Sequence, residues 1–245
     1  MSKNKLTKFA ECKTFSNMIE PEKIEFIETG YKLKSCWNRD FFRNNNPLYL
    51  ELGCGTGAYS CAMSDFYPDR NFIAVDIKGS RMWNGAKKTN DENKKNIAFL
   101  RTKIEFIDSF FAKDEISGIW ITFPDPHLRN SERSLRLTSP EFLEKYFLIL
   151  KKSGFINLKT DSKELFDYTK SVLNKKLIIP EIITDDLYSC ENTFDYEVTN
   201  IQTVYESRFL TEGKKICYIK FKKNGAYHHS SSSFFILAFS CLTTM

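Results

Sequence analysis

Four residues whose types and spacing could bind a ligand follow an apolar segment in the first quarter of the chain. The sequence LYLELGCGTG at 48–57 carries an acid, Glu51, and then glycines at Gly53, Gly55 and Gly57. Glycine has no Cβ, so glycines at alternate positions let the backbone turn tightly and a ligand approach it closely. A strand that runs through such a turn into a helix is the nucleoside- or phosphate-binding corner of an open α/β sheet. The segment therefore predicts a ligand site, with a glycine-rich turn that binds nothing as the alternative.

The spacing of these glycines narrows the class of ligand. It is G-x-G-x-G, whereas dinucleotide sites carry G-x-G-x-x-G. Glu51 also lies just ahead of the turn, where a dinucleotide site would place pyrophosphate. A carboxylate there suits a ligand with a cationic end, such as the amino acid moiety of S-adenosylmethionine.

A second acid, Asp76, ends the apolar segment NFIAVD about twenty-five residues after Glu51. This separation fits one β-α-β unit, and an acid at the end of the second strand can accept hydrogen bonds from ribose hydroxyls. Aspartate at a strand end is also a common helix N-cap. Together with the glycine turn, however, Asp76 favours a ligand.

A third acid, Asp125, stands between two prolines at the end of the segment IWITFPDP. Proline fixes its own φ and restricts the residue before it, so this carboxylate is held rigidly, although a plain proline turn is the alternative. A basic stretch follows, and arginine offers a planar fork that matches phosphate. A solvated charged loop is the alternative for that stretch. Its candidate side chains are His127, Arg129, Arg133 and Arg136.

A fourth acid, Asp161, ends the segment INLKTD, so Glu51, Asp76, Asp125 and Asp161 all occupy the ends of expected strands. Ligands of parallel sheets bind at the carboxyl ends of the strands, and we expect these acids along one rim of the sheet. The later segment TVYESRF at 203–209 mixes hydroxyl, aromatic, acidic and basic side chains. By itself it indicates only an amphipathic piece.

Composition excludes several classes of function. The chain has 245 residues, 42% of them hydrophobic, and a net charge of +5, which permits an anionic partner without demanding one. Its seven cysteines include no C-x-x-C pair, so they indicate free thiols of a reducing cytoplasm rather than disulfides or a zinc site. With three histidines, no metal is expected. No apolar stretch reaches the roughly twenty residues of a membrane helix, so no membrane partner is expected either.

The alternation of expected elements predicts an α/β fold with a doubly wound, mostly parallel sheet. We expect residues 1–46 to be an N-terminal extension that wraps or flanks the core, 47–224 to form the domain and 225–245 to be a tail of unknown role. The expected strands are 48–52, 71–76, 96–101, 117–123, 155–160, 177–183 and 215–222. The expected helices are 58–67, 80–91, 104–113, 139–150 and 162–174.

These segments together resemble the bacterial single-subunit tRNA (guanine-N7-)-methyltransferase family, which has the Rossmann-like class I methyltransferase fold. The resemblance extends from about Asn4 to Lys222. Its most specific features are the proline-bracketed acid, the basic loop, the K-T-D strand end and the T-x-Y-E segment, because methyltransferases of other substrates share only the glycine corner. The segments that carry it are LELGCGTG (50–57), FIAVDIKGSRMW (72–83), FLRTKIEFIDSFF (99–111), WITFPDPHLRNSERSLRLTSPEFL (120–143), INLKTDS (156–162) and TVYESRF (203–209).

The resemblance implies a role for each matching residue, with Asp125 as the catalytic acid between cofactor and base. The implied S-adenosylmethionine contacts are Glu51, Gly53, Gly55, Gly57, Asp76, Thr102, Lys103 and Asp125. The implied substrate contacts are Arg129, Asp161, Thr203, Val204, Tyr205 and Glu206. The family commonly has an acid near position 103, where this chain has a lysine, so we expect backbone groups to replace that acidic contact. His127 replaces the usual aromatic residue after P-D-P.

The implied activity is transfer of a methyl group from S-adenosylmethionine to N7 of a guanine in the variable loop of tRNA, by a cytoplasmic monomer or homodimer. Two other classes stay open on the sequence. A methyltransferase of a small molecule or protein would show no activity on tRNA. A non-catalytic RNA-binding or cofactor-sensing protein would bind without methyl transfer.

Overall fold

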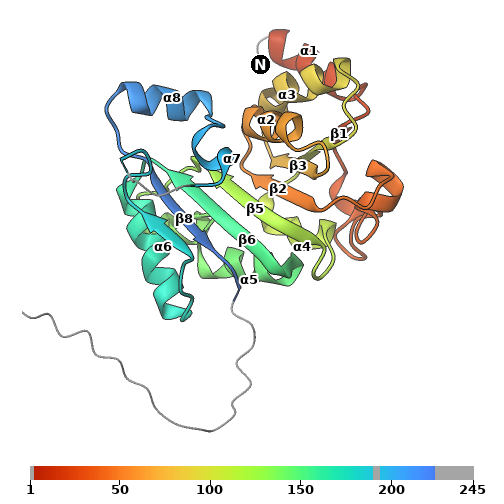
Figure 1. Cartoon of the computed structure of the whole chain (residues 1–245). Coiled ribbons are helices and arrows are strands. Elements are labelled where there is room, and N and C mark those ends of the chain that lie inside the picture. Colours follow the sequence, from red (N-terminus) through yellow and green to blue (C-terminus); the bar gives the residue numbers. More distant parts are fainter. Residues whose placement is uncertain (1–2, 190–193, 224–245) are drawn as a thin grey trace, which may run out of the picture.

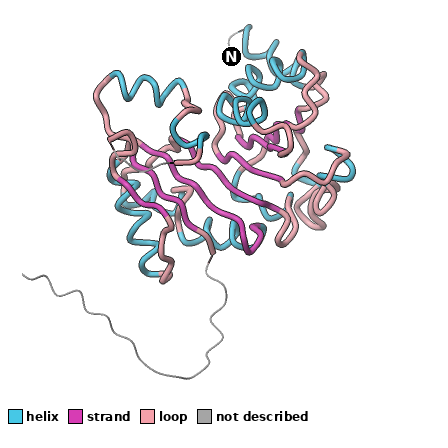
Figure 2. The backbone as a smooth tube through the Cα atoms, in the orientation of Figure 1, coloured by secondary structure: helices cyan, strands magenta, loops and turns pink. Residues whose placement is uncertain are grey.

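An eight-stranded sheet forms the centre of the protein (Figures 1 and 2). The structure is a computed structural model, and it describes residues 3–189 and 194–223. The strand order across the sheet is β1-β4-β3-β2-β5-β6-β8-β7. Strands β1 to β6 pair in parallel, whereas β8 runs antiparallel to both β6 and β7. The strands are β1 (Met18–Ile19), β2 (Leu48–Leu52), β3 (Asn71–Asp76), β4 (Ile97–Arg101), β5 (Ile116–Thr122), β6 (Leu150–Thr160), β7 (Ile182–Thr184) and β8 (Cys217–Phe221).

Helices cover both faces of this sheet. In Figure 1, α2 and α3 lie on one face with α1 packed against α3, and α4, α5 and α6 lie on the other. The helices are α1 (Lys3–Cys12), α2 (Ala58–Phe66), α3 (Gly79–Asp91), α4 (Ile107–Phe110), α5 (Pro140–Ile149), α6 (Lys163–Lys175), α7 (Tyr196–Thr199) and α8 (Val204–Thr211). None of the helices within 3–189 and 194–223 combines the length and the apolar character that crossing a membrane requires. The two-sided arrangement confirms the predicted doubly wound, mostly parallel α/β fold.

Strand β3 shows why these apolar segments form central strands. Its side chains point alternately to the two faces of the sheet. Ile73 and Val75 join the hydrophobic cluster under α5 and α6, whereas Phe72 and Ala74 join the cluster under α2 and α3. A strand buried on both faces needs a continuous apolar run, and the polar Asp76 ends this run at the carboxyl end of the strand.

The N-terminal segment flanks the core, as expected, and it also extends the sheet. Strand β1 pairs with β4 at one edge. Trp37 is fully buried in the same cluster as the central strands, and its Nε1 donates a hydrogen bond to the Phe110 carbonyl at 2.9 Å. The boundaries at residues 47 and 224 stay predictions, and the tail at 225–245 lies outside the described residues.

The helix expected at 104–113 is much shorter in the structure. A 3₁₀ turn at Ile104–Phe106 leads into the single turn of α4. The helix ends there because Phe111 adopts an extended conformation and is buried in the core. Burial of this side chain therefore outweighs the helical pattern of the sequence.

One later prediction also differs from the structure, and one later segment forms a helix that was not predicted. Of the strand expected at 177–183, only β7 forms, because Leu177 has a positive φ of 54° after α6 and Pro180 has no N–H for a ladder. The segment 203–209, for which no element was predicted, begins α8 instead.

Candidate functional site

The glycine turn after β2 adopts the conformation that its sequence predicts. Gly53, Gly55 and Gly57 have φ values of 74°, 57° and 73°, a region that residues with a Cβ rarely occupy. Gly57 is also the residue from which α2 begins. A Cβ on Gly57 would overlap the ring of Phe99, so this position requires glycine for space as well as for φ.

Asp76 at the end of β3 holds this turn in place. Its Oδ2 accepts a hydrogen bond from the Gly55 backbone N–H at 2.9 Å. Its Oδ1 accepts one from the Lys78 N–H at 2.8 Å. The two adjacent strand ends are thereby joined by one carboxylate.

Glu51 lies beneath the turn rather than at its surface, with a relative exposure of 4%. Its carboxylate accepts hydrogen bonds from the backbone N–H of Ser60 at 3.0 Å, from the Ser60 hydroxyl, and from the Thr122 hydroxyl at 2.8 Å. Burial raises the pKa of Glu51 to about 7, although the hydrogen bonds from Ser60 and Thr122 act in the opposite direction. This side chain joins β2, α2 and β5 at the point where the turn begins.

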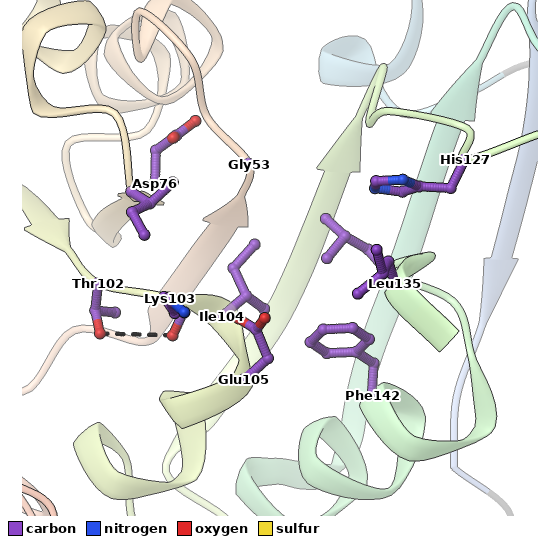
Figure 3. Close-up of a pocket in the computed structure, with 11 residues that line it drawn as sticks. Gly53, Asp76, Thr102, Lys103, Ile104, Glu105, His127, Leu135 and Phe142 are labelled. Atoms are coloured by element: carbon purple, nitrogen blue, oxygen red, sulfur yellow. Dashed lines mark hydrogen bonds between the residues drawn. The ribbon is translucent and has the colours of Figure 1, made fainter. Parts of the chain in front are cut away.

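A cavity of about 260 Å³ opens beside the turn, at the carboxyl ends of β2, β3 and β4 (Figure 3). Four of the implied cofactor contacts line it: Gly53, Asp76, Thr102 and Lys103. Figure 3 shows Asp76 and Thr102 on one side of the cavity and His127, Leu135 and Phe142 on the other. The remaining lining residues are Ile77, Ile104, Glu105 and Leu137.

This lining fits a nucleoside. The apolar side chains offer a surface for a flat ring, and Asp76 offers a carboxylate at the rim. The Thr102 backbone N–H donates to the Asp76 carbonyl at 3.1 Å, so β3 and β4 present these groups in a fixed relation. Within the described residues, no group of three histidine, cysteine, aspartate or glutamate side chains could hold a metal ion.

Sequence reasoning missed Leu135, Leu137 and Phe142, and it assigned His127 to the basic stretch rather than to this wall of the cavity. The available signal was their position directly after the P-D-P segment, because that loop must return across the strand ends to reach α5. Sequence reasoning assigned no role to Glu105, and the structure places it on the cavity.

The loop that carries Asp125 is strained on both sides of it. Phe123 has a φ of 49° and His127 a φ of 44°, and both are in the left-handed region that disfavours residues with a Cβ. Asp125 is exposed, and its Oδ1 accepts a hydrogen bond of 3.3 Å from the His127 backbone N–H. Strain of this kind persists when the surrounding structure holds it in place.

Arg136 supplies that support. Its side chain is buried, Nε donates to the Pro126 carbonyl at 3.0 Å, and Nη2 donates to the His127 carbonyl at 3.0 Å. The guanidinium also lies 4.3 Å from the ring centre of Tyr168. Arg136 is thus not the exposed phosphate-binding side chain that the sequence suggested. Arg129, by contrast, is exposed, with Nη1 3.7 Å from Glu132 Oε1.

The remaining implied substrate contacts are divided between the surface and the interior. Asp161 is partly exposed, and its Oδ2 lies 3.3 Å from Lys214 Nζ. Thr203 caps α8 by accepting a hydrogen bond from the backbone N–H of Glu206, whose own side chain is fully buried. Val204 and Tyr205 are exposed.

Comparison with known proteins identifies the family. A family model described as "Putative methyltransferase" matches residues 45–219, which span every implied site residue from the glycine turn to α8. The chain is 44% identical over 221 residues to the tRNA (guanine-N(7)-)-methyltransferase of Christiangramia forsetii, covering 90% of this chain and 98% of the relative. It is 45% identical to the protein of the same name from Bacteroides fragilis, covering 90% of this chain and 86% of the relative.

The chain belongs to the tRNA (guanine-N7-)-methyltransferase family. It is therefore a methyltransferase, as its sequence indicated. Among solved structures, that of the 16S rRNA methyltransferase KamB is similar, with a TM-score of 0.57, 13% identity, and coverage of 75% of this chain and 91% of that one. That likeness supports the class I methyltransferase fold alone. We call the strained segment 123–127, which carries Asp125, the proline loop. In this family member the glycine turn, the proline loop and the cavity lie together at the carboxyl ends of the parallel strands.

Proposed function

We propose that this protein transfers the methyl group of S-adenosylmethionine to N7 of a guanine in the variable loop of tRNA, in the cytoplasm. The observation that carries the proposal is the combination of 44–45% identity to proteins of that name with a cavity between the glycine turn and the proline loop. When bound, S-adenosylmethionine supplies an electrophilic methyl group, which passes to N7 as the carbon–sulfur bond breaks.

The cavity is the site that we assign to this cofactor. Asp76 would accept hydrogen bonds from ribose hydroxyls, and the N–H groups of Gly55 and Lys78 already hold its two oxygens. Gly53, which lines the cavity, would let the cofactor approach the backbone closely. Thr102, Lys103 and the apolar residues beside them would enclose the ring system.

Glu51 would act on the cofactor through the turn. Its carboxylate accepts hydrogen bonds from Ser60 and Thr122, so it fixes the start of α2 against β5. A negative charge beneath the turn also favours the cationic amino acid end of the cofactor. Binding of that cation would lower the pKa of Glu51, since opposite charges stabilise each other.

The reaction needs no general base, because N7 of guanine carries a lone pair and no proton. Catalysis then rests on alignment and on stabilisation of the positive charge that develops on the imidazole ring. The two carboxylate oxygens of Asp125 can accept hydrogen bonds from guanine N1–H and its exocyclic amine. These N–H groups become stronger hydrogen-bond donors as N7 gains positive charge, so their contact with Asp125 is stronger in the transition state than in the ground state.

Arg129 would bind the phosphate backbone beside this site, because its guanidinium is exposed on the loop that follows Asp125. Asp161, Val204 and Tyr205 would contact the RNA at the neighbouring strand end. The test is incubation with labelled methyl donor and unmodified tRNA, followed by chemical cleavage at N7-methylguanine. Label at one variable-loop guanine supports the proposal, whereas label on protein or small molecules with none on tRNA refutes it.

A further inference from the structure

A lysine and a glutamate side chain meet in the interior beneath α8. Lys159 of β6 and Glu206 of α8 both have 0% exposed side chains, and Lys159 Nζ lies 2.5 Å from Glu206 Oε1. Lys159 Nζ also donates to the Val198 carbonyl of α7 at 2.8 Å. The Tyr188 hydroxyl donates to the same Glu206 oxygen at 2.8 Å. One lysine of the sheet therefore holds both α7 and α8.

A buried ion pair is a costly way to attach a helix. The desolvation of two charges offsets most of their attraction, so apolar side chains of similar size would stabilise the fold as well or better. Burial lowers the pKa of Lys159, and the adjacent Glu206 counteracts that shift. Such a pair disfavours positions of α8 that would leave Lys159 buried without its counter-charge.

The position that the pair specifies lies over the proline loop. The Phe209 ring of α8 packs against the Phe123 ring, with centres 5.8 Å apart. The backbone N–H of Phe123 donates to the Lys159 carbonyl at 2.8 Å. Phe123 is two residues before Asp125, so the same lysine contacts the start of the strained loop and the helix above it.

Two side chains at the start of α8 are exposed to solvent. Val204 is 78% exposed and Tyr205 is 52% exposed. Proteins that act on unpaired bases of RNA commonly stack them on aromatic side chains. An exposed tyrosine on the helix whose Phe209 packs against Phe123 suits that contact.

We propose that Glu206 is a positioning residue: through its ion pair with Lys159 it docks α8 so that Tyr205 receives the target nucleotide next to Asp125. This inference rests on the proposed function for the identity of the nucleotide. It assigns Glu206 to the interior of the protein rather than to contact with RNA. Tyr205 is then the residue of α8 that touches the substrate.

The experiment compares Glu206→Met, Lys159→Met and the double variant Lys159→Met/Glu206→Met in methyl transfer to unmodified tRNA. Each single variant leaves one charge buried alone, so the KM for tRNA should rise between about tenfold and a hundredfold. The double variant removes both charges and should return to within about threefold of the parent protein. If Glu206 contacted RNA directly, the double variant would stay as impaired as Glu206→Met, and the proposal would be wrong.

Tyr205 tests the second half of the inference. Tyr205→Leu should raise the KM for tRNA, and Tyr205→Phe should restore it because the ring is retained. The matched control on the same helix is Arg208→Met/Glu212→Met, which removes an exposed ion pair of 2.7 Å and should leave the KM unchanged. Equal KM values for Tyr205→Leu and the parent protein would also overturn the proposal.

Hydrogen exchange of the α8 amides gives a readout that needs no activity. Exchange should accelerate in Glu206→Met and slow again in the double variant. If Glu206→Met proves unstable, Glu206→Gln takes its place, since it keeps the shape of the side chain. A parent protein that methylates no tRNA would refute the proposed function, while exchange would still decide whether the pair docks α8.

Discussion

The Thr122 hydroxyl at the end of β5 donates a hydrogen bond of 2.8 Å to Glu51 at the end of β2. The two strands pair directly, and each leads into one of the two loops of the site. Glu51 thus connects the glycine turn on its own strand with the loop of Asp125 on the neighbouring one. A buried carboxylate in this position makes both loops sensitive to its charge.

The raised pKa of Glu51 predicts how stability depends on pH. The carboxyl titrates near 4.5 in the unfolded chain and at about 7 in the folded protein. Between these values the folded state binds more protons, so the free energy of unfolding should fall as pH rises from about 4.5 to 7. Urea denaturation across this range should show that the free energy of unfolding of Glu51→Gln changes less with pH than that of the parent protein. Glu144→Gln, which changes a carboxyl that is 71% exposed, should keep the slope of the parent protein. An unaltered slope in Glu51→Gln would contradict the assignment.

The glycine turn should respond differently at two of its positions. Gly57→Ala places a Cβ into the ring of Phe99 at a positive φ, so it should destabilise the protein by about 2–4 kcal/mol and abolish cofactor binding. Gly55→Ala meets no atom within 4 Å and should cost about 1–2 kcal/mol from its φ alone. Thermal unfolding and calorimetry with S-adenosylhomocysteine measure both effects. Equal losses in the two variants would show that space beside Phe99 does not matter.

Substitutions of Arg136 and Arg129 should have different effects although both residues belong to one loop: the first should affect mainly stability and the second mainly tRNA binding. Arg136→Met removes a buried guanidinium that donates to two carbonyls, so it should lower stability by about 2–4 kcal/mol and reduce kcat. Arg129→Met should change stability by less than about 0.5 kcal/mol, weaken tRNA binding and reduce the salt slope of that binding by about one. Denaturation measures the loss of stability, and tRNA-binding titrations between low and moderate salt measure the salt slope, in each of the two variants. A reduced salt slope in Arg136→Met would show that its guanidinium reaches the RNA.

Asp125 should affect turnover far more than cofactor binding. Asp125→Ala removes the carboxylate assigned to the guanine edge, and we expect turnover to fall by at least about a hundredfold. The affinity for S-adenosylmethionine should change by less than about threefold, because the cavity wall of Gly53, Asp76 and Thr102 is untouched. Single-turnover kinetics and calorimetry provide the two measurements. Retained turnover would remove Asp125 from the mechanism.

Much of this site could be predicted because its chemistry is local in sequence. Gly53, Gly55 and Gly57 fix a turn by their own φ preferences, and Asp76 ends a strand whose apolar run is visible in the sequence. The parallel arrangement then brings strand ends to one edge, so Gly53, Asp76 and Thr102, which end or follow β2, β3 and β4, line one cavity. These features need no knowledge of side-chain packing.

The rest depended on packing that no single segment reveals. The positive charge of Arg136 suggests a surface side chain, yet its guanidinium is buried against the carbonyls of Pro126 and His127. Glu206 suggests a polar contact, yet it pairs with Lys159, 47 residues earlier in the chain. Whether a charged side chain is buried depends on partners that are distant in the sequence, and the type of the residue alone does not identify those partners.

The central claim is that N7 of a tRNA guanine receives the methyl group. The most direct measurement compares two transcripts of one tRNA, identical except that one carries 7-deazaguanine at the variable-loop position and therefore has a C–H in place of N7. We expect labelled methyl transfer to the guanine transcript and none above background to the 7-deazaguanine transcript. Equal labelling of both would contradict the account, because the methyl group would then be going to another atom.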